Sequence, residues 1–287
     1  MLGSANMDLI VNVARAPTLG ETVTGTAFRA VPGGKGANQA LAAAHAGGEV
    51  RFAGAVGDDA YGRQIRALLA AAGVDVSALD TVTVPTGTAH ITVDRSGANS
   101  IVVVPGANGT VHALSDKHRT AIAGADILLL QLELPMAAVV EAARCAHRQG
   151  VAVVLTPAPP VPLPAELLDA VDLLVPNENE EAALGLRPAE HRDLLVTLGA
   201  AGARYERHGR PPLIAPAFEV AAVDTTGAGD AFVGAFAVAR GEHLDLEGAL
   251  RWASAAAALS VREFGASASL ADRAEIEAFL YEHRADR

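Results

Sequence analysis

The segment Asp224-Thr225-Thr226-Gly227-Ala228-Gly229-Asp230 leads directly into an apolar stripe that runs from Ala228 to Phe236. The stripe has helical spacing, so the two glycines lie at the start of a helix. Free backbone N–H groups and the positive end of the helix dipole bind anions there, and glycine lets a phosphate come close. A carboxylate at Asp230 would repel that phosphate unless it accepts a proton from an attacking hydroxyl group, so the segment indicates phosphoryl transfer. The alternative is that Asp230 only stabilises the first helical turn.

A second glycine cluster, Gly33-Gly34-Lys35-Gly36, also precedes a helix with one apolar face. Neither familiar nucleotide motif fits these two clusters. A Walker loop needs Ser or Thr after its Gly-Lys pair, but Lys35 is followed by Gly36. A dinucleotide fingerprint needs a third glycine, but the Gly227 cluster has Phe232 at that position. Both familiar nucleotide motifs are therefore excluded.

Short apolar runs alternate with alanine-rich helical stretches along most of the chain. The runs predict strands at 50–56, 127–132, 151–155, 173–175 and 194–198. This alternation predicts a mostly parallel central sheet flanked by helices on both faces. Two β-rich regions without helices, 21–31 and 82–104, predict hairpins that form a small β-sheet lid. With 287 residues, 51% of them hydrophobic, we expect a single α/β domain over 1–287.

The composition excludes several classes of function. The formal charge is −11 and no basic run stands out, which argues against a nucleic acid partner. The single cysteine, Cys145, excludes an intrachain disulfide and a zinc cluster and is typical of the cytoplasm. The start of the chain has no export signal and no long apolar stretch follows, so we expect no membrane insertion. The nine histidines show no metal-binding spacing.

Six segments occur in the order found in the PfkB-type carbohydrate kinases, which the chain resembles over nearly its whole length. They are Gly3–Asp8, Gly33–Ala40, Gln131–Glu133, Pro176–Glu180, Val196–Gly199 and Asp224–Asp230. The form GGKGANQA is most similar to the ribokinase branch of that family. The resemblance implies a ribokinase-like fold and transfer of the ATP γ-phosphate to the primary hydroxyl of D-ribose, giving ribose 5-phosphate. The alternatives are a kinase of this family for another sugar or a nucleoside, and a non-catalytic sugar-binding protein.

The resemblance also implies a sugar site in which several segments contribute. The substrate-binding residues would be Asn6, Asp8, Gly33, Gly34, Lys35, Asn38, Glu133 and Asp230. Asp230 would be the catalytic base that activates the primary hydroxyl. Buried carboxylates and amides discriminate between polyols because each missing hydroxyl leaves a polar group unpaired. The alternatives are a polar turn at Asn6 and Asp8, a solvated strand end at Glu133 and a surface position for Lys35.

On the nucleotide side, the implied ATP-binding residues are Asn177, Thr197, Gly199, Gly227, Ala228 and Gly229. Glu180 would hold Mg²⁺ through water, which suits an ion that keeps most of its hydration shell. The alternative for Asn177 and Glu180 is a helix cap with a first-turn acid. The family resemblance further implies an activating K⁺ ion, and its ligands would come from Asp224, Thr226, Ser260, Gly265 and Ser269.

The resemblance implies a homodimer formed through the lid, although the sequence alone does not fix the oligomeric state. The chain departs from the family between Asn177 and Thr197, where it lacks about one helix and Leu186–Asp193 must form the connection. This departure keeps the non-catalytic alternative open.

Overall fold

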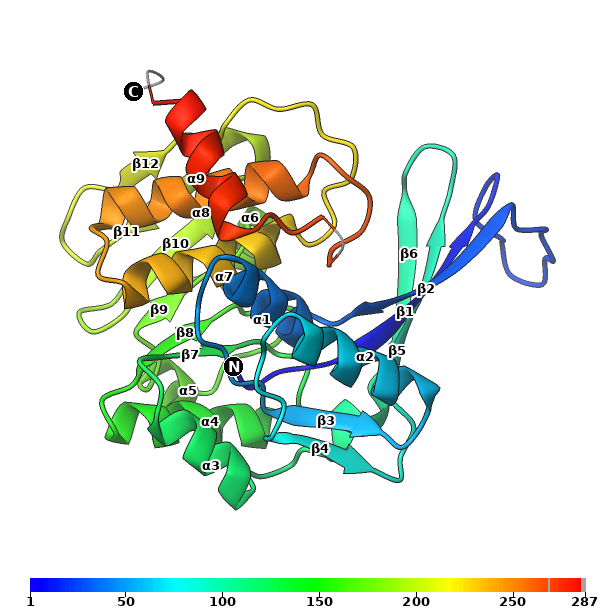
Figure 1. The fold of residues 1–287 in the computed structure, drawn as a ribbon, viewed down its shortest axis with the longest axis horizontal. Coiled ribbons are helices and arrows are strands. Elements are labelled where there is room, and N and C mark those ends of the chain that lie inside the picture. The colour runs from blue at the N-terminus through cyan, green and yellow to red at the C-terminus, as the bar shows by residue number, and fades with distance from the viewer. Residues whose placement is uncertain (268, 285–287) are drawn as a thin grey trace.

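The computed structural model describes residues 1–267 and 269–284. A helix-covered core contains the central sheet, and a separate sheet projects from one side of it (Figure 1). The core sheet has the order β12-β11-β10-β9-β8-β7. Pairing is parallel from β7 to β10 and antiparallel at β11 and β12. The strands are β7 (Ile127–Leu130), β8 (Ala152–Leu155), β9 (Leu173–Leu174), β10 (Asp193–Thr197), β11 (Ala203–Glu206) and β12 (Leu213–Ala215).

Both faces of the parallel strands are buried, because successive side chains point to opposite sides of a sheet. Leu128 and Leu130 join one apolar cluster with α3, α4 and α5. Leu129, Val154 and Leu195 join a second cluster with α7, α8 and α9 on the opposite face. These helices are α3 (Asp116–Ala123), α4 (Met136–Arg148), α5 (Ala165–Leu168), α7 (Ala228–Gly241), α8 (Leu246–Ser260) and α9 (Arg273–Glu282). The predicted mostly parallel sheet with helices on both faces is confirmed.

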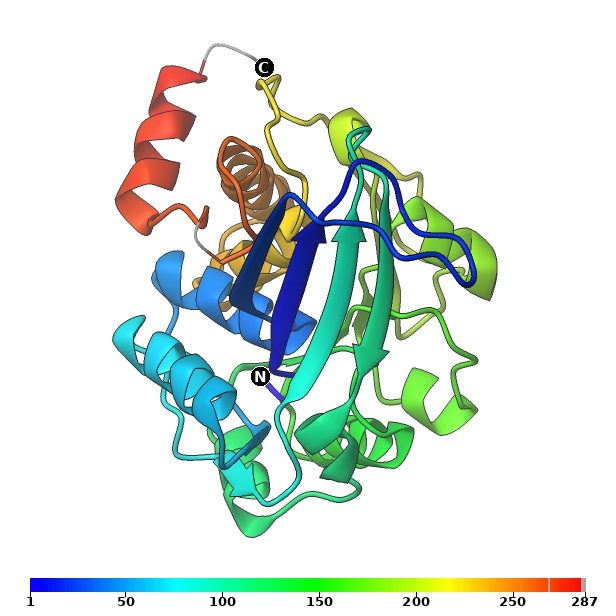
Figure 2. The same cartoon turned by 90° about the vertical axis from the view of Figure 1, so that its right-hand side faces the viewer.

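The projecting sheet, called the lid below, has the order β2-β1-β5-β6. Figure 2 shows its long strands from the side that faces away from the core helices. Its central pair, β1 and β5, is parallel, whereas both outer pairs are antiparallel. The four strands are β1 (Asn6–Asn12), β2 (Ala27–Gly33), β5 (Gly87–Val93) and β6 (Asn99–Val104).

The lid differs in one respect from the hairpins expected at 21–31 and 82–104. The second region does contain an antiparallel hairpin, β5 with β6. In the first region, β2 pairs along its whole length with β1, so Thr22-Val23-Thr24 lies in the long connection between these strands. An ion pair between Arg15 and Glu21 closes that connection. Thr22-Val23-Thr24 is therefore not a strand, although its residues are β-branched. The strand that pairs with β2 is β1, which lies earlier in the chain than the predicted region.

A third apolar cluster joins the lid to the core. Met7 and Leu9 of β1 pack with residues of α1 (Lys35–His45) and α2 (Ala60–Ala71). Close by, β3 (Gly54–Gly57) pairs in parallel with β4 (Leu79–Val82). Single parallel bridges from Leu2 to Ala53 and to Leu130 connect this region with β7. The strand predicted at 50–56 is therefore a short strand preceded by isolated bridges.

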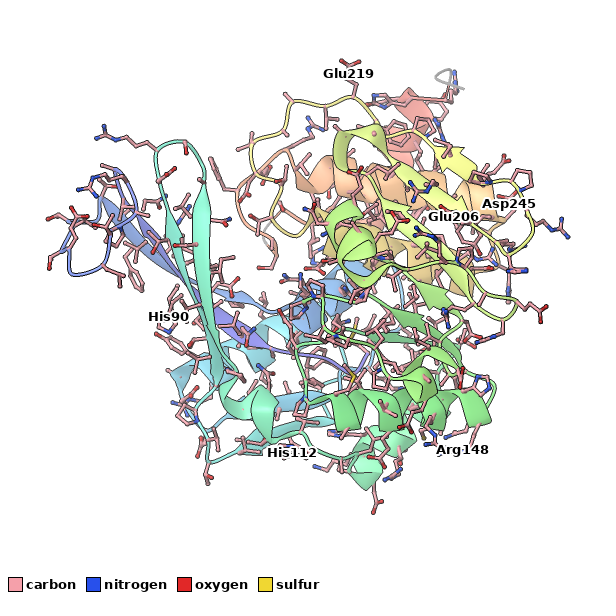
Figure 3. All side chains as sticks on the ribbon, turned by 180° about the vertical axis from the view of Figure 1, so that it is seen from behind. His90, His112, Arg148, Glu206, Glu219 and Asp245 are labelled. Atoms are coloured by element: carbon pink, nitrogen blue, oxygen red, sulfur yellow. The ribbon has the colours of Figure 1, made fainter. Side chains whose placement is uncertain are left out.

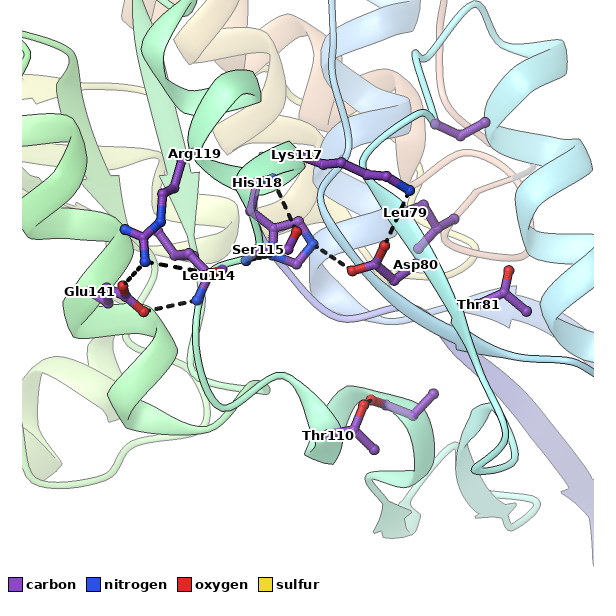
Figure 4. Close-up of polar contacts among 12 residues, drawn as sticks. Leu79, Asp80, Thr81, Thr110, Leu114, Ser115, Lys117, His118, Arg119 and Glu141 are labelled. Carbon is purple, nitrogen blue, oxygen red and sulfur yellow. Dashed lines mark hydrogen bonds and ion pairs between the residues drawn. The ribbon is translucent and has the colours of Figure 1, made fainter.

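Polar side chains tie α3 to β4 (Figure 4). Ser115 and His118 form a capping box, in which His118 Nδ1 accepts from the Ser115 N–H at 3.3 Å. Because Nδ1 accepts, the ring proton is assigned to Nε2, which lies 3.3 Å from Asp80 Oδ2. Lys117 Nζ lies 3.8 Å from the other carboxylate oxygen of Asp80. His118 is buried, and these contacts give it a structural role.

Candidate active site

The carboxyl ends of the parallel strands meet at one edge of the core sheet, where open α/β sheets bind ligands. Glu133 follows β7, Thr156 follows β8, Asn177 follows β9, and Thr197 ends β10. A parallel bridge places Asn177 beside Thr197. Four segments that are far apart in the chain thus supply polar groups to the same edge.

Glu133 is held by the start of β1 and the start of α1. Its Oε2 accepts a hydrogen bond from Ser4 Oγ at 2.5 Å and another from the backbone N–H of Lys35 at 3.1 Å. Ser4 Oγ in turn accepts from the backbone N–H of Gly36 at 3.3 Å. A Cβ on Gly36 would lie 2.5 Å from the Ser4 nitrogen, so this close approach requires glycine. Glu133 is therefore a fixed member of the site and not a solvated strand end.

Asn6 and Asp8 lie on β1 and not in the polar turn that was the alternative interpretation. Asn6 is 3% exposed, and its Oδ1 accepts from Asn108 Nδ2 at 2.7 Å. Asn108 belongs to η1 (Gly106–Thr110), a single 3₁₀ turn, and also bonds both backbone groups of Ala5. Asn108 therefore fixes the chain where β1 begins, and no motif in the sequence indicates this role.

Asp230 lies in the first turn of α7 and is 8% exposed. Two amides of α1 donate to its carboxylate: Asn38 Nδ2 to Oδ2 at 3.1 Å and Gln39 Nε2 to Oδ1 at 3.0 Å. The two helices pass very close to each other, since a Cβ on Gly234 would lie 2.7 Å from the Ala42 Cβ. The side-chain amides of Asn38 and Gln39, which are consecutive on α1, can therefore both reach the Asp230 carboxylate.

Burial and like charges dominate the electrostatics of this region. Burial raises the pKa of Asp8 to about 7, together with the nearby charges of Glu133 and Asp230. Burial also raises the pKa of Asp230, against the opposing effects of Lys35 and of the amides from Gln39 and Asn38. For Lys35, burial works against the charge, but Asp230, Glu133, Glu180 and Asp8 outweigh it and raise the pKa. Lys35 is thus a cation that compensates four neighbouring acids, of which Asp230 is buried and the other three are half-buried.

A cleft of about 910 Å³ lies between Lys35 and Asp230 at one end and the ends of β9 and β10 at the other. All six residues expected to bind ATP line it, which are Asn177, Thr197, Gly199, Gly227, Ala228 and Gly229. Apolar side chains form another wall, including Phe218, Val220, Phe232, Val233 and Val261. An apolar lining of this kind suits the planar base of a nucleotide. No motif in the sequence distinguishes these apolar residues from ordinary core positions.

The loop before α7 has the backbone that an anion site needs. Gly227 has φ of 79°, and helix α7 starts at Ala228. A Cβ on Gly227 would lie 2.6 Å from that of Ala266, so the loop packs tightly on the segment after α8. The Ala228 N–H donates to the Thr225 carbonyl at 3.3 Å, so among the described residues the N–H groups of Gly227 and Gly229 are the ones left available to a phosphate group at the start of this 14-residue helix.

Asp224 connects the same two segments. Its carboxylate accepts from the N–H groups of Thr226 and Gly265, each at 3.0 Å. Partial burial would raise the pKa of Asp224, but the hydrogen bonds from Thr226 and Gly265 outweigh it and lower that pKa. Ser269 Oγ donates to the Gly265 carbonyl at 2.6 Å, and Ser260 Oγ donates to the Ala257 carbonyl at 2.9 Å. The residues expected to bind K⁺ therefore lie on two adjoining segments.

Asn177 caps α6 (Glu178–Leu184). Asn177 Oδ1 accepts from the Glu180 N–H at 2.9 Å, and Glu180 Oε2 accepts from the Asn177 N–H at 2.8 Å. This capping box is the alternative interpretation made from the sequence, and both residues also line the cleft. Between α6 and β10 the structure has an irregular connection with one bridge, Ala189 to Arg192. The shortened segment thus still brings Asn177 and Thr197 together.

Other classes of site receive no support from the part of the chain that the structure describes. Within 1–267 and 269–284, no three His, Cys, Asp or Glu side chains are grouped so as to hold a metal ion. Histidines are dispersed, with His90 on the lid and His112 beyond its base (Figure 3). Among these residues, no helix is both long and apolar enough to cross a membrane.

Comparison with known proteins agrees with this geometry. The sequence profile of the pfkB family of carbohydrate kinases matches residues 1–273. The chain belongs to this family. Among its curated relatives, a pfkB-family "Ribokinase" from Bacillus subtilis is 45% identical over 98% of both chains.

The solved structure of Arabidopsis thaliana ribokinase complexed with ribose and ATP superposes on this pfkB-family kinase with a TM-score of 0.90. That comparison covers 97% of each chain at 36% identity. The ribokinase-like fold expected from the sequence is therefore confirmed. A "Deoxyribokinase" from Salmonella typhi is also similar, at 33% identity over 94% of both chains. The family and the phosphotransferase class are thus established.

Proposed function

We propose that this pfkB-family kinase transfers the γ-phosphate of ATP to the primary hydroxyl of D-ribose and releases ribose 5-phosphate and ADP. The observation that carries the proposal is the position of Asp230. It is a buried carboxylate in the first turn of α7, at the junction of the nucleotide cleft and a cluster of polar side chains. A carboxylate in that place serves a hydroxyl acceptor and would be unfavourable in a site that only binds phosphate.

The sugar would lie between β1 and the core. Asn6 and Asp8 would bond its hydroxyls from the lid side, and Glu133 would bond the ring from the opposite side. Gly33, Gly34, Lys35 and Asn38 would hold the remaining edge. Fixed polar groups of this kind reject a sugar with a missing hydroxyl, because a buried group would then lose its partner.

In the reaction, Asp230 would accept the proton of the primary hydroxyl as its oxygen attacks the γ-phosphorus. The bond between the γ-phosphorus and the β,γ-bridging oxygen breaks, and ADP leaves. The N–H groups of Gly227, Ala228 and Gly229 would stabilise the charge that develops on the phosphoryl oxygens, and the Lys35 ammonium is close enough to Asp230 to compensate the local negative charge. Asn177, Thr197 and Gly199 would position the nucleotide.

Two cations fit the residues present. Mg²⁺ would bind through the nucleotide phosphates and water, with Glu180 contacting the water shell, and it would neutralise the triphosphate. K⁺ would bind where the Asp224 and Thr226 segment adjoins Ser260, Gly265 and Ser269. The support is that Asp224 already receives hydrogen bonds from both segments, so an ion there would order the anion-binding loop. Replacing K⁺ with Na⁺ should lower kcat, and an equal rate in both salts would refute the K⁺ site.

We also propose a homodimer formed through the lid and, given the single buried thiol, a cytoplasmic location. All six residues of the edge strand β6 are exposed, although Ile101 to Val104 are apolar. Exposed apolar edges of this kind favour pairing with another sheet. Ile101→Asp should shift the molar mass measured by light scattering from dimer to monomer. Ile214→Asp, at an exposed apolar position on β12 across the molecule, is the matched control and should stay dimeric.

The function is tested by ADP release from the purified protein with ATP, Mg²⁺ and K⁺. The acceptor panel should contain ribose, deoxyribose, fructose and nucleosides. We expect the highest kcat/KM with ribose. A higher value with deoxyribose would move the substrate to that of the Salmonella typhi relative, and a folded protein that releases no ADP with any acceptor would support the sugar-binding alternative.

A further inference from the structure

We infer that Gln39 and Gln131 form a buried amide relay that aims the carboxylate of Asp230 at the acceptor hydroxyl, which makes Gln39 a positioning residue. The inference rests on the proposed base role of Asp230. It adds two buried residues, neither of which lines the nucleotide cleft.

The relay is a continuous chain of hydrogen bonds between segments far apart in the sequence. Gln131 Nε2 donates to Gln39 Oε1 at 2.5 Å. Gln39 Nε2 then donates to Asp230 Oδ1 at 3.0 Å and to Thr156 Oγ1 at 3.2 Å. Gln39 is 0% exposed and Gln131 is 1% exposed, so neither amide can exchange its partners for water. Every polar atom of the Gln39 side chain is therefore used.

The donors and acceptors allow only one orientation of the Gln39 amide. If the amide flipped, its oxygen would face the Asp230 carboxylate and its nitrogen would face the donor nitrogen of Gln131. Both contacts would be repulsive, and both would be buried. The Asp230 carboxylate, which only accepts, therefore fixes which end of Gln39 it meets, and Gln131 supports that orientation by donating to Gln39 Oε1.

The relay matters for the base because a carboxylate held in one orientation presents a lone pair to the sugar hydroxyl without first losing rotational freedom. Asn38 holds Oδ2, but Asn38 is also a proposed sugar contact and is 7% exposed. Gln39 holds Oδ1 from within the core, and its effect is independent of the ligand. The hydrogen bond from Gln39 also favours the ionised form and opposes the increase in the pKa of Asp230 that burial causes. The relay thus restrains the direction of the base and opposes the effect of burial on its pKa.

The test compares Gln39→Met and Gln131→Met with the unaltered enzyme in steady-state kinetics from pH 5 to pH 9. Methionine keeps the length of the side chain but removes both amide functions. For Gln39→Met we expect kcat to fall about tenfold or more, since a bond to a charged group is lost. The acid limb of the kcat profile should move to higher pH, while the ribose KM changes less than about twofold. Gln131→Met should give a shift in the same direction but smaller.

A general loss of packing would lower the melting temperature without moving the acid limb, so the pH profile separates positioning from stability. Gln149→Met, an exposed glutamine just after α4, is the matched control and should leave kcat and the profile unchanged. An unmoved limb and an unchanged kcat in Gln39→Met would overturn the relay. If Gln39→Met does not fold, an unmoved limb in Gln131→Met would do so. Asp230→Asn is measured in parallel, because activity in that variant would refute the base itself and not the relay.

Discussion

The two halves of the site differ in how far they are built before any ligand arrives. On the acceptor side, Asn6, Asn38 and Asp230 are all less than 9% exposed and bonded to other side chains. On the nucleotide side, Asn177 and Gly229 are exposed, and the cleft is bounded largely by loops. A preorganised acceptor site fixes the geometry of the reacting hydroxyl, whereas ATP brings its own charge, water and metal. Substitutions on the acceptor side should therefore lower kcat far more than substitutions on the nucleotide side.

The largest expected effect is that of Asp230→Asn. It removes the base but keeps the shape, so kcat should fall by about a thousandfold or more. Ribose binding measured by calorimetry should stay within about tenfold, because the other sugar contacts remain. Retained turnover in this variant would refute the base assignment and with it the view that the acceptor side carries the chemistry.

Glu133→Gln should have the next largest effect. The variant keeps an acceptor for Ser4 Oγ and the Lys35 N–H but loses the charge that strengthens bonds to sugar hydroxyls. We expect the ribose KM to rise about tenfold or more while the ATP KM is unchanged. The control is Glu141→Gln, which also removes a glutamate charge but lies away from the site. Glu141 is on α4 and forms an ion pair with Arg119 of α3. An unchanged ribose KM would contradict the contact role of Glu133.

Asp8→Asn should show how much ionised Asp8 lowers the free energy of unfolding. The folded-state pKa of Asp8, about 7, lies above its usual value of 3.8, so between these values the folded state binds more protons than the unfolded state. Stability contributed by protonated Asp8 is present below pH 4 and is lost as the pH rises to about 7. Urea unfolding should therefore show that Asp8→Asn is more stable than the unaltered protein at pH 8, with a smaller gain at pH 5. The exposed Asp169→Asn should show no such trend.

The smallest effect is expected on the nucleotide side, from Asn177→Ala. Loss of the cap should reduce the free energy of unfolding by about 1 kcal/mol and raise the ATP KM, with little change in the ribose KM. Asp272→Ala is a closely matched control, since Asp272 and Glu275 form the same kind of capping box at α9. Equal ATP KM values in the two variants would mean that Asn177 is only a cap.

The sequence predicted those elements that can be recognised from a short run of neighbouring residues. The strands β7 to β10 are continuous apolar runs, and both glycine-rich helix starts can be recognised without any partner. The lid was only partly predicted, because the pairing of β2 with β1 depends on a strand about twenty positions earlier. Asn108, Gln39 and Gln131 were missed for a similar reason. Their roles depend on which atoms they meet after folding, and Gln39 and Asp230 are 191 positions apart.

The lid strand β1 runs from the acceptor site to the exposed end of the lid. It begins beside Ser4, carries Asn6 and Asp8, and continues into the exposed end of the lid at Asn12. The proposed sugar contacts Asn6 and Asp8 and the exposed end of the lid therefore lie on one continuous strand. Any displacement of β1 on sugar binding would be carried along the strand to the exposed loop between β1 and β2, so a fluorophore on that loop would measure whether the lid moves when the acceptor site is filled.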